Sequence, residues 1–236
     1  MKEMITCIGV DGAKAAWLGV WRHKEGLAHG VYKTPAALML AHRRAKVVAI
    51  DIPIGLTEEL RRDADVEARR FVGGYRASSV FSAPVRCVLD APTQLKASYL
   101  HRLKNGRGFG VQGFAILPKI RQWDQFLQLD KRSRNRVYEV HPEVSFAALR
   151  GGKGLEFNKK TREGFEARLR LLATVFDIEA LNGLLVSVDR KLAARDDVLD
   201  ALVALWSAER ILSGDAVALP DPIPYDAMGL PMAIRY

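Results

Sequence analysis

With 236 residues, 49% of them hydrophobic and 27% charged, the chain is long enough to bury a substantial core and has the composition of a globular protein. No apolar run reaches the ~18 residues of a membrane span, and the N-terminus shows no signal peptide, so we predict a cytoplasmic protein. Cys7 and Cys87 lack the spacing of metal ligands, which favours two buried thiols over a zinc site.

The net charge of +9 is concentrated in one segment of the chain. Residues 61–136 contain 16 Lys or Arg against 6 Asp or Glu, so this segment carries a surplus of 10 positive charges and the remainder is nearly balanced. A localised basic segment favours a polyanionic partner such as nucleic acid. The alternative is a solubilising surface without a binding role.

The first fifty residues predict a β-β-β-α-β unit. Thr34 and Pro35 have the residue types of an N-cap and a first helical position, and they predict a helix that runs to about Arg44. Short apolar runs separated by turn residues predict four strands, at Ile5–Val10, Ala16–Trp21, Leu27–Tyr32 and Lys46–Ile50. The fourth is apolar throughout, which is typical of a central strand covered on both faces.

The rest of the chain predicts further helices and one more strand. The expected elements are helices at roughly Leu60–Phe71, Lys119–Leu129, 165–176, 178–186 and Asp197–Leu212, and a strand at Val137–Val140. We expect one α/β domain over residues 1–236, with a mixed five-stranded sheet and insertions at about 74–136 and 144–190. The Pro-rich tail, residues 220–231, is predicted to lie over the surface.

Four carboxylates are expected to converge. Asp11 closes the first predicted strand and Asp51 the fourth, and a right-handed crossover makes these strands parallel neighbours, so both aspartates emerge at one edge of the sheet. Asp197 and Asp200 are three residues apart and share a face of the last helix. Four such groups repel one another unless a cation is present. Hard oxygen ligands favour Mg²⁺ or Mn²⁺ as the cofactor.

Each aspartate also has a purely structural interpretation. Asp11 precedes a glycine, as in many turns, and Asp197 has the position of a helix cap. A second polar cluster contains Glu139 and His141, which would share one face of the fifth strand. Glu139 is a candidate additional ligand and His141 a candidate proton donor or acceptor. The alternative for this pair is an exposed strand face.

Five residues are candidate contacts for a substrate phosphate. Ser78 and Ser79 offer hydroxyls and Arg86 a guanidinium. Lys119 and Lys160 offer ammonium groups. The structural alternatives are a turn with an exposed arginine and two solvated lysines.

The order of several short motifs resembles that of the DUF429 family, whose members are predicted nucleases of ribonuclease H fold. The matching segments are Gly9–Gly12 with Trp17, Ala49–Leu56, Arg62–Asp65 with Ala68 and Arg69, Ser78–Phe81 with Pro84 and Arg86, Glu139–Glu143 with Phe146, Lys159–Thr161, and Asp196–Leu202. The resemblance implies a ribonuclease H-like fold. It also suggests a distant similarity to RuvC-type resolvases, whose metal ligands match Asp11, Asp51, Asp197 and Asp200. Those resolvases often have Glu where this chain has Asp51, which shortens the reach by one methylene.

We therefore expect a metal-dependent nuclease whose catalytic residues are Asp11, Asp51, Asp197, Asp200, Glu139 and His141. Two alternatives remain open, a nucleic-acid-binding protein without catalysis and a nucleotide-dependent phosphotransferase on a related core. A resolvase that cuts two strands symmetrically would also need to be a homodimer.

Overall fold

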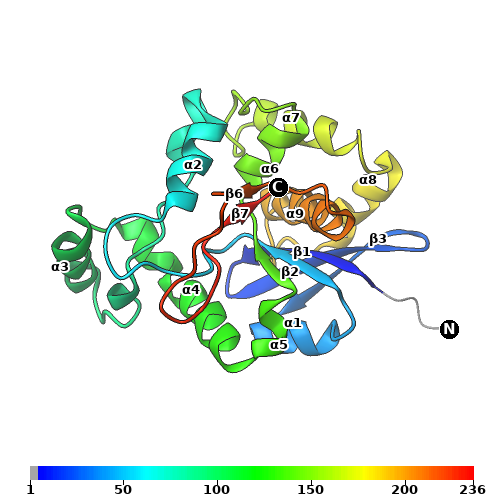
Figure 1. Ribbon diagram of the computed structural model, residues 1–236. Coiled ribbons are helices and arrows are strands. Elements are labelled where there is room, and N and C mark those ends of the chain that lie inside the picture. Colours follow the sequence, from blue (N-terminus) through cyan, green and yellow to red (C-terminus); the bar gives the residue numbers. More distant parts are fainter. Residues whose placement is uncertain (1–4) are drawn as a thin grey trace.

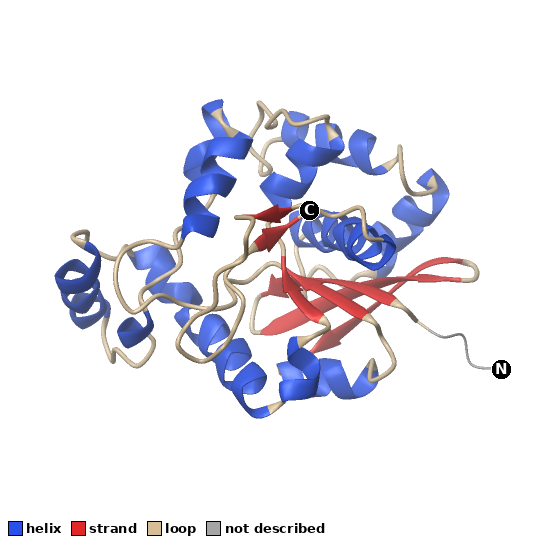
Figure 2. Cartoon of the chain, in the orientation of Figure 1, coloured by secondary structure: helices blue, strands red, loops and turns tan. Residues whose placement is uncertain are grey.

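The computed structural model describes residues 5–236 and has a mixed α/β fold built on a five-stranded sheet (Figures 1 and 2). Its strands are β1 (Cys7–Ala13), β2 (Ala16–His23), β3 (Gly26–Tyr32), β4 (Val47–Ile50) and β5 (Val137–Glu139). They lie in the order β3-β2-β1-β4-β5. The first three strands are antiparallel, whereas β4 is parallel to both β1 and β5. The predicted parallel pairing of the first and fourth strands is therefore confirmed.

Helices cover both faces of this sheet (Figure 2). Within residues 5–236 the α-helices are α1 (Pro35–Ala41), α2 (Asp63–Val72), α3 (Gln94–Asn105), α4 (Val111–Leu129), α5 (Lys131–Arg134), α6 (Pro142–Leu149), α7 (Arg162–Leu172), α8 (Ile178–Ser187) and α9 (Arg195–Ser213). Two 3₁₀ turns, Gly74–Ser79 and Arg86–Val88, and a small sheet of β6 (Ala218–Leu219) and β7 (Ile234–Arg235) complete the fold. No helix in the described part of the chain is both long and apolar enough to cross a membrane.

Alternate residues of the central strands point to two separate cores. Cys7 and Ala49 face the core that contains α9, whereas Ile8 and Val48 face the core that contains α4. This two-residue period is the usual consequence of the pleated strand. It decides which polar side chains at the strand ends can meet α9.

The backbones of β1 and α9 touch at Gly9. A Cβ atom on Gly9 would lie 2.1 Å from the Ala201 carbonyl oxygen and 2.1 Å from the Leu205 nitrogen. Only a glycine therefore allows the helix to lie this close to the strand. Because Asp11 follows Gly9 by two residues and Asp200 precedes Ala201, the contact brings the two carboxylates into one site.

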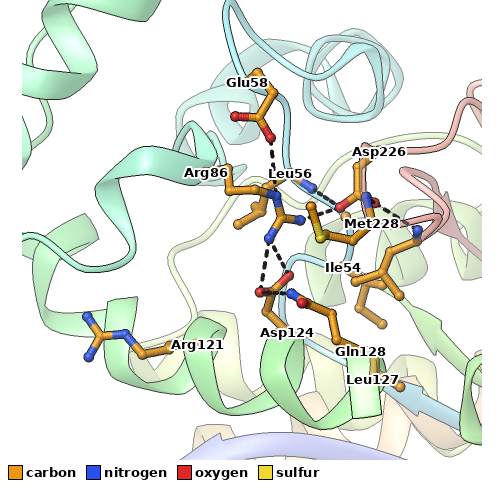
Figure 3. Close-up of polar contacts among 12 residues, drawn as sticks. Ile54, Leu56, Glu58, Arg86, Arg121, Asp124, Leu127, Gln128, Asp226 and Met228 are labelled. Carbon is orange, nitrogen blue, oxygen red and sulfur yellow. Dashed lines mark hydrogen bonds and ion pairs between the residues drawn. The ribbon is translucent and has the colours of Figure 1, made fainter. Parts of the chain in front are cut away.

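The C-terminal tail runs along the surface but is fixed by one buried carboxylate. Asp226 accepts hydrogen bonds from the backbone of Leu56 at 3.0 Å and of Leu230 at 2.8 Å. It also pairs with Arg86, whose guanidinium binds both Asp124 oxygens at 3.0 Å (Figure 3). This cluster ties the tail to α4.

Cys7 is buried as predicted. Cys87 is exposed, which makes the prediction of a second buried thiol wrong. The thiol lies in the short 3₁₀ turn that carries Arg86, and only Val88 of that turn is buried.

Candidate functional site

Asp11 and Asp51 reach the same side of the sheet as α9. Asp11 lies inside β1 rather than at its end, because β1 stays paired with β2 beyond the last residue that pairs with β4, Val10. Asp51 directly follows β4. Each aspartate continues the alternation of the residues that face α9, and Asp200 approaches from that helix. The predicted convergence of these carboxylates is therefore present in the structure.

Burial and mutual repulsion shift the titration of the cluster. Burial raises the pKa of Asp11 well above its ordinary value, and the charges of Asp200, Asp51 and Asp197 raise it further. Burial also raises the pKa values of Asp51 and Asp200 to about 6. Asp11 and Asp200 are only 6% and 1% exposed. Carboxylates that are buried next to one another, with so little contact with water, favour the binding of protons or cations.

Lys159 is the cation closest to the cluster, and the sequence did not identify it as a site residue. Its Nζ donates to Asp200 Oδ2 at 2.5 Å and lies 3.9 Å from Asp196. Burial alone would lower the pKa of Lys159, but Asp200, Asp11 and Asp51 raise it well above its ordinary value. The other oxygen of Asp200, Oδ1, is buried without a hydrogen-bond partner in the described chain.

Lys119 lies on the opposite side of the cluster from α9. Its Nζ donates to the Ala16 carbonyl at 3.1 Å and lies 4.9 Å from the centre of the Trp17 ring. A Cβ on Gly12 would come within 2.8 Å of this ammonium group, so the glycine leaves room for it. Burial lowers the pKa of Lys119, and Asp11, Asp197 and Asp51 act in the opposite direction.

Asp197 both caps α9 and belongs to the carboxylate cluster. Its Oδ2 accepts the backbone N–H of Ala194 at 2.9 Å and so caps α9. Burial raises its pKa, the cap lowers it, and its charge acts on Asp11. One carboxylate oxygen therefore serves the helix, and the other is left for the cluster.

Glu139 lies on the other face of the sheet from Asp51. It pairs in register with Ile50, whose side chain points into the α4 core, so Glu139 turns the same way. Arg62 binds both its oxygens at 2.8 Å, and the Ile54 N–H donates to it at 2.7 Å. Burial raises the pKa of Glu139 and Arg62 opposes that effect. Arg62 also donates to Asp65 at 2.5 Å, which makes a buried ion triad.

His141 caps α6. Its Nδ1 accepts the Glu143 backbone N–H at 3.2 Å, so a neutral ring carries its proton on Nε2. Burial lowers the pKa of His141, which favours this neutral form. The Glu143 carboxylate is held by Arg168 at 2.6 Å, and its Oε2 is buried with no partner among the described residues.

The predicted phosphate contacts lie in three places, of which the cavity beside Lys119 is one. Ser79 and Lys160 line a cavity next to the carboxylates, and Ser78 is exposed beside it. Arg86 lies elsewhere, since Asp124, Asp226 and Glu58 occupy its guanidinium (Figure 3). Several other arginines of the basic segment are likewise engaged by protein groups, which leaves fewer of them to contact a polyanion. The arginines that donate hydrogen bonds within the protein include Arg62, Arg69, Arg86, Arg121, Arg134 and Arg136.

Two hollows meet at the carboxylates. A cavity of about 380 Å³ extends toward Glu139, His141 and Asn158. A second one of about 330 Å³ extends toward Asp11 and Lys119. Four residues line both: Asp51, Ile52, Ile116 and Lys159. A ligand in either cavity would therefore reach Asp51 and Lys159.

The four aspartates do not surround a single position at which a metal ion would be ligated. Within residues 5–236, no group of three or more His, Cys, Asp or Glu side chains is arranged to hold a metal ion. The cation that contacts the cluster is the ammonium of Lys159. Metal ligation by Asp11, Asp51, Asp197 and Asp200 would need Lys159 to move away from Asp200.

Residues 9–224 match the family model described as "Protein of unknown function (DUF429)". No curated protein and no solved structure matches the chain. The family match covers most of the sequence and includes every carboxylate of the cluster. The chain therefore belongs to the DUF429 family.

Proposed function

We propose that this DUF429 protein is a metal-dependent nuclease that hydrolyses phosphodiester bonds in nucleic acid. The observation that carries the proposal is the convergence of four aspartates from β1, β4 and α9 at a partly buried site between two cavities. Burial, together with repulsion from the other three carboxylates, raises the pKa of Asp11, so the site gains from binding a cation.

The fold supports the same proposal. The strand order β3-β2-β1-β4-β5, with two antiparallel pairings followed by two parallel ones, agrees with the ribonuclease H-like fold that the resemblance implies. In RuvC-type resolvases the metal ligands come from the first strand, the fourth strand and the last helix. Asp11, Asp51, Asp197 and Asp200 have those positions here.

The donor set suits a hard divalent cation. Carboxylate oxygens are the ligands that Mg²⁺ and Mn²⁺ prefer, and Asp200 Oδ1 is a buried acceptor without a partner in the described chain. Asp11, Asp51, Asp197 and Asp200 would hold the ion once Lys159 leaves Asp200. When bound, such an ion supplies charge stabilisation on the phosphate and activation of a water molecule.

The remaining residues would position the substrate. Lys119 on one side and Lys160 on the other place positive charge at each cavity, where they would bind the phosphates flanking the scissile bond. Hydrolysis adds the water oxygen to phosphorus and breaks the bond from phosphorus to the leaving oxygen, so the products are a phosphate monoester and a hydroxyl. His141 Nε2–H, which faces away from the helix cap, would donate a hydrogen bond to the substrate.

A cleavage assay tests this proposal. Single-stranded, duplex and branched DNA, and RNA, would be incubated with Mg²⁺ or Mn²⁺ and the wild-type protein, Asp11→Asn or Asp51→Asn. Asp63→Asn is the matched control, because Asp63 is an exposed carboxylate in the first turn of α2. We expect cutting that both cluster variants lose by at least ~10²-fold and the control keeps. Wild-type protein that cuts none of these substrates would refute the nuclease.

One observation favours a second candidate, a nucleic-acid-binding protein without catalysis. Lys159 already neutralises Asp200 through a contact between protein groups. Under this alternative the carboxylates would only orient the lysine. Binding that persists in Asp11→Asn and Asp51→Asn, together with no cleavage, would identify it.

A further inference from the structure

The 380 Å³ cavity joins the carboxylates to a second group of polar side chains. Arg76 and Ser79 line it from the 3₁₀ turn Gly74–Ser79, and Asn158 and Lys160 line it from the loop before α7. The carboxylate chemistry needs neither Arg76 nor Asn158. Their place in the same cavity as Asp51 therefore requires another explanation.

The two cations of this group, Arg76 and Lys160, have no partner among residues 5–236. Within the described residues, the side chains of Arg76 and Lys160 form no hydrogen bond or ion pair, and Arg76 Nε is buried without an acceptor. The absence of an ion pair distinguishes them from Arg62 and Arg168, which also lie near the site but are each bound to a carboxylate. Two unpaired cations beside a hydroxyl and an amide offer the groups that bind an anion such as phosphate.

The two walls that carry these cations are held against each other. A Cβ on Gly154 would lie 2.5 Å from the Val72 carbonyl oxygen, so the loop touches the end of α2 just before the 3₁₀ turn. Further along the loop, the Asn158 carbonyl accepts from the backbone and the hydroxyl of Thr161, both at 3.0 Å. Asn158 Oδ1 accepts the Lys160 N–H at 3.0 Å. These contacts hold the backbone of both walls of the cavity in place.

The size of the cavity limits what it can hold. At about 380 Å³ it is at the lower end of pockets for small molecules, which measure roughly 300–1,000 Å³. Such a pocket takes one nucleotide and not a stretch of duplex. Phe81 and Ile116 provide apolar walls, and His141 and Asn158 provide hydrogen-bonding groups for the sugar or base.

We infer that this cavity binds the terminal nucleotide of a single strand, with its terminal phosphate on Arg76 and Lys160 and the scissile phosphate beside Asp51. This inference rests on the proposed nuclease and names its substrate as a phosphorylated strand end. The protein then releases nucleotides from the end, and a closed circle is a poor substrate.

Cleavage of matched strands tests whether a phosphorylated end is required and which end, 5′ or 3′, is recognised. DNA and RNA oligonucleotides of one sequence would carry a 5′-phosphate, a 3′-phosphate or hydroxyl ends, or be closed into a circle. We expect one phosphorylated form to be cut at least ~10-fold faster than the hydroxyl form and the circle to be cut slowest. The double variant Arg76→Met/Lys160→Met should lose that preference. Lys153→Met removes a charge from an exposed position on the same loop and should keep it. A circle cut as fast as the linear strand would overturn the inference and leave the nuclease intact.

Binding without turnover separates the two proposals. Calorimetry would measure nucleoside 5′- and 3′-monophosphates, and the parent nucleosides, against wild type and the same variants without metal. We expect a monophosphate to bind the double variant at least ~10-fold more weakly, with no change in Lys153→Met. This result supports the cavity site even if no strand is cut, which would refute the nuclease alone. No binding by the wild type, or equal binding by the double variant, would overturn the cavity site.

Discussion

Replacing Gly9 by alanine should both destabilise the protein and disturb the carboxylate cluster. The added Cβ would lie 2.1 Å from two backbone atoms of α9, which is 1.3 Å short of the 3.4 Å at which ordinary contact begins. Neither obstacle is a flexible side chain, so α9 or β1 must shift by about that distance. Overpacking in a core typically costs about 1–3 kcal/mol, and we expect the upper end of this range.

The matched control is Gly19→Ala in the neighbouring strand β2. A Cβ there would meet the Tyr32 ring at 3.4 Å, a normal contact with a side chain that can adjust. Urea unfolding would give the free energy for both variants. We expect a loss of about 3 kcal/mol for Gly9→Ala and less than about 1 kcal/mol for Gly19→Ala. Equal stability of the two variants would show that the backbone contact between β1 and α9 is wrong.

Three further predictions concern charged groups. Burial raises the pKa of Asp51 to about 6, so the folded protein loses stability as pH rises from about 4 through about 6 and this carboxyl ionises. Asp51→Asn should therefore raise Tm near pH 8 and change it little near pH 4. Arg62→Met leaves the carboxylates of Glu139 and Asp65 buried without a cation and should lower the free energy of unfolding in urea by about 3–5 kcal/mol. The control Arg162→Met removes an exposed arginine and should barely change that free energy. Arg86→Met should lower Tm but leave nucleic-acid affinity within about twofold, because acidic side chains occupy the Arg86 guanidinium. A larger loss of affinity, measured in a salt titration, would show that Arg86 contacts a phosphate after all.

The sheet could be predicted because its strands are short apolar runs bounded by turn residues. What the runs do not show is where pairing stops, so β1 was predicted to end before Asp11 although it continues to Ala13. Helix α3 was not predicted from the sequence, although Leu95, Tyr99 and Leu103 recur at the four-residue spacing of a helix and Thr93 caps its start. The structure leaves these three side chains exposed.

Side-chain partners at the site were harder to predict than its carboxylates. The two-residue period places Glu139 and His141 on one face, but only the register with Ile50 shows that Glu139 faces away from Asp51. Lys159 lies in a loop, where neither periodicity nor capping fixes a side chain. Its role depends on a contact with Asp200, 41 residues away in the sequence.

Lys159 does not remove the repulsion in the cluster, and this predicts how a metal should bind. One ammonium contacts Asp200, yet burial and the remaining carboxylates still raise the pKa of Asp11, and burial keeps the pKa values of Asp51 and Asp200 at about 6. Below about pH 6 protons relieve the repulsion, and above it a cation must do so, so protons and metal compete. Calorimetric titration with Mn²⁺ should therefore give a lower Kd near pH 7.5 than near pH 5.5, by at least ~10-fold, because two acidic groups lose their protons in that interval. A Kd that is the same at both pH values would mean that the ion is not bound by these carboxylates.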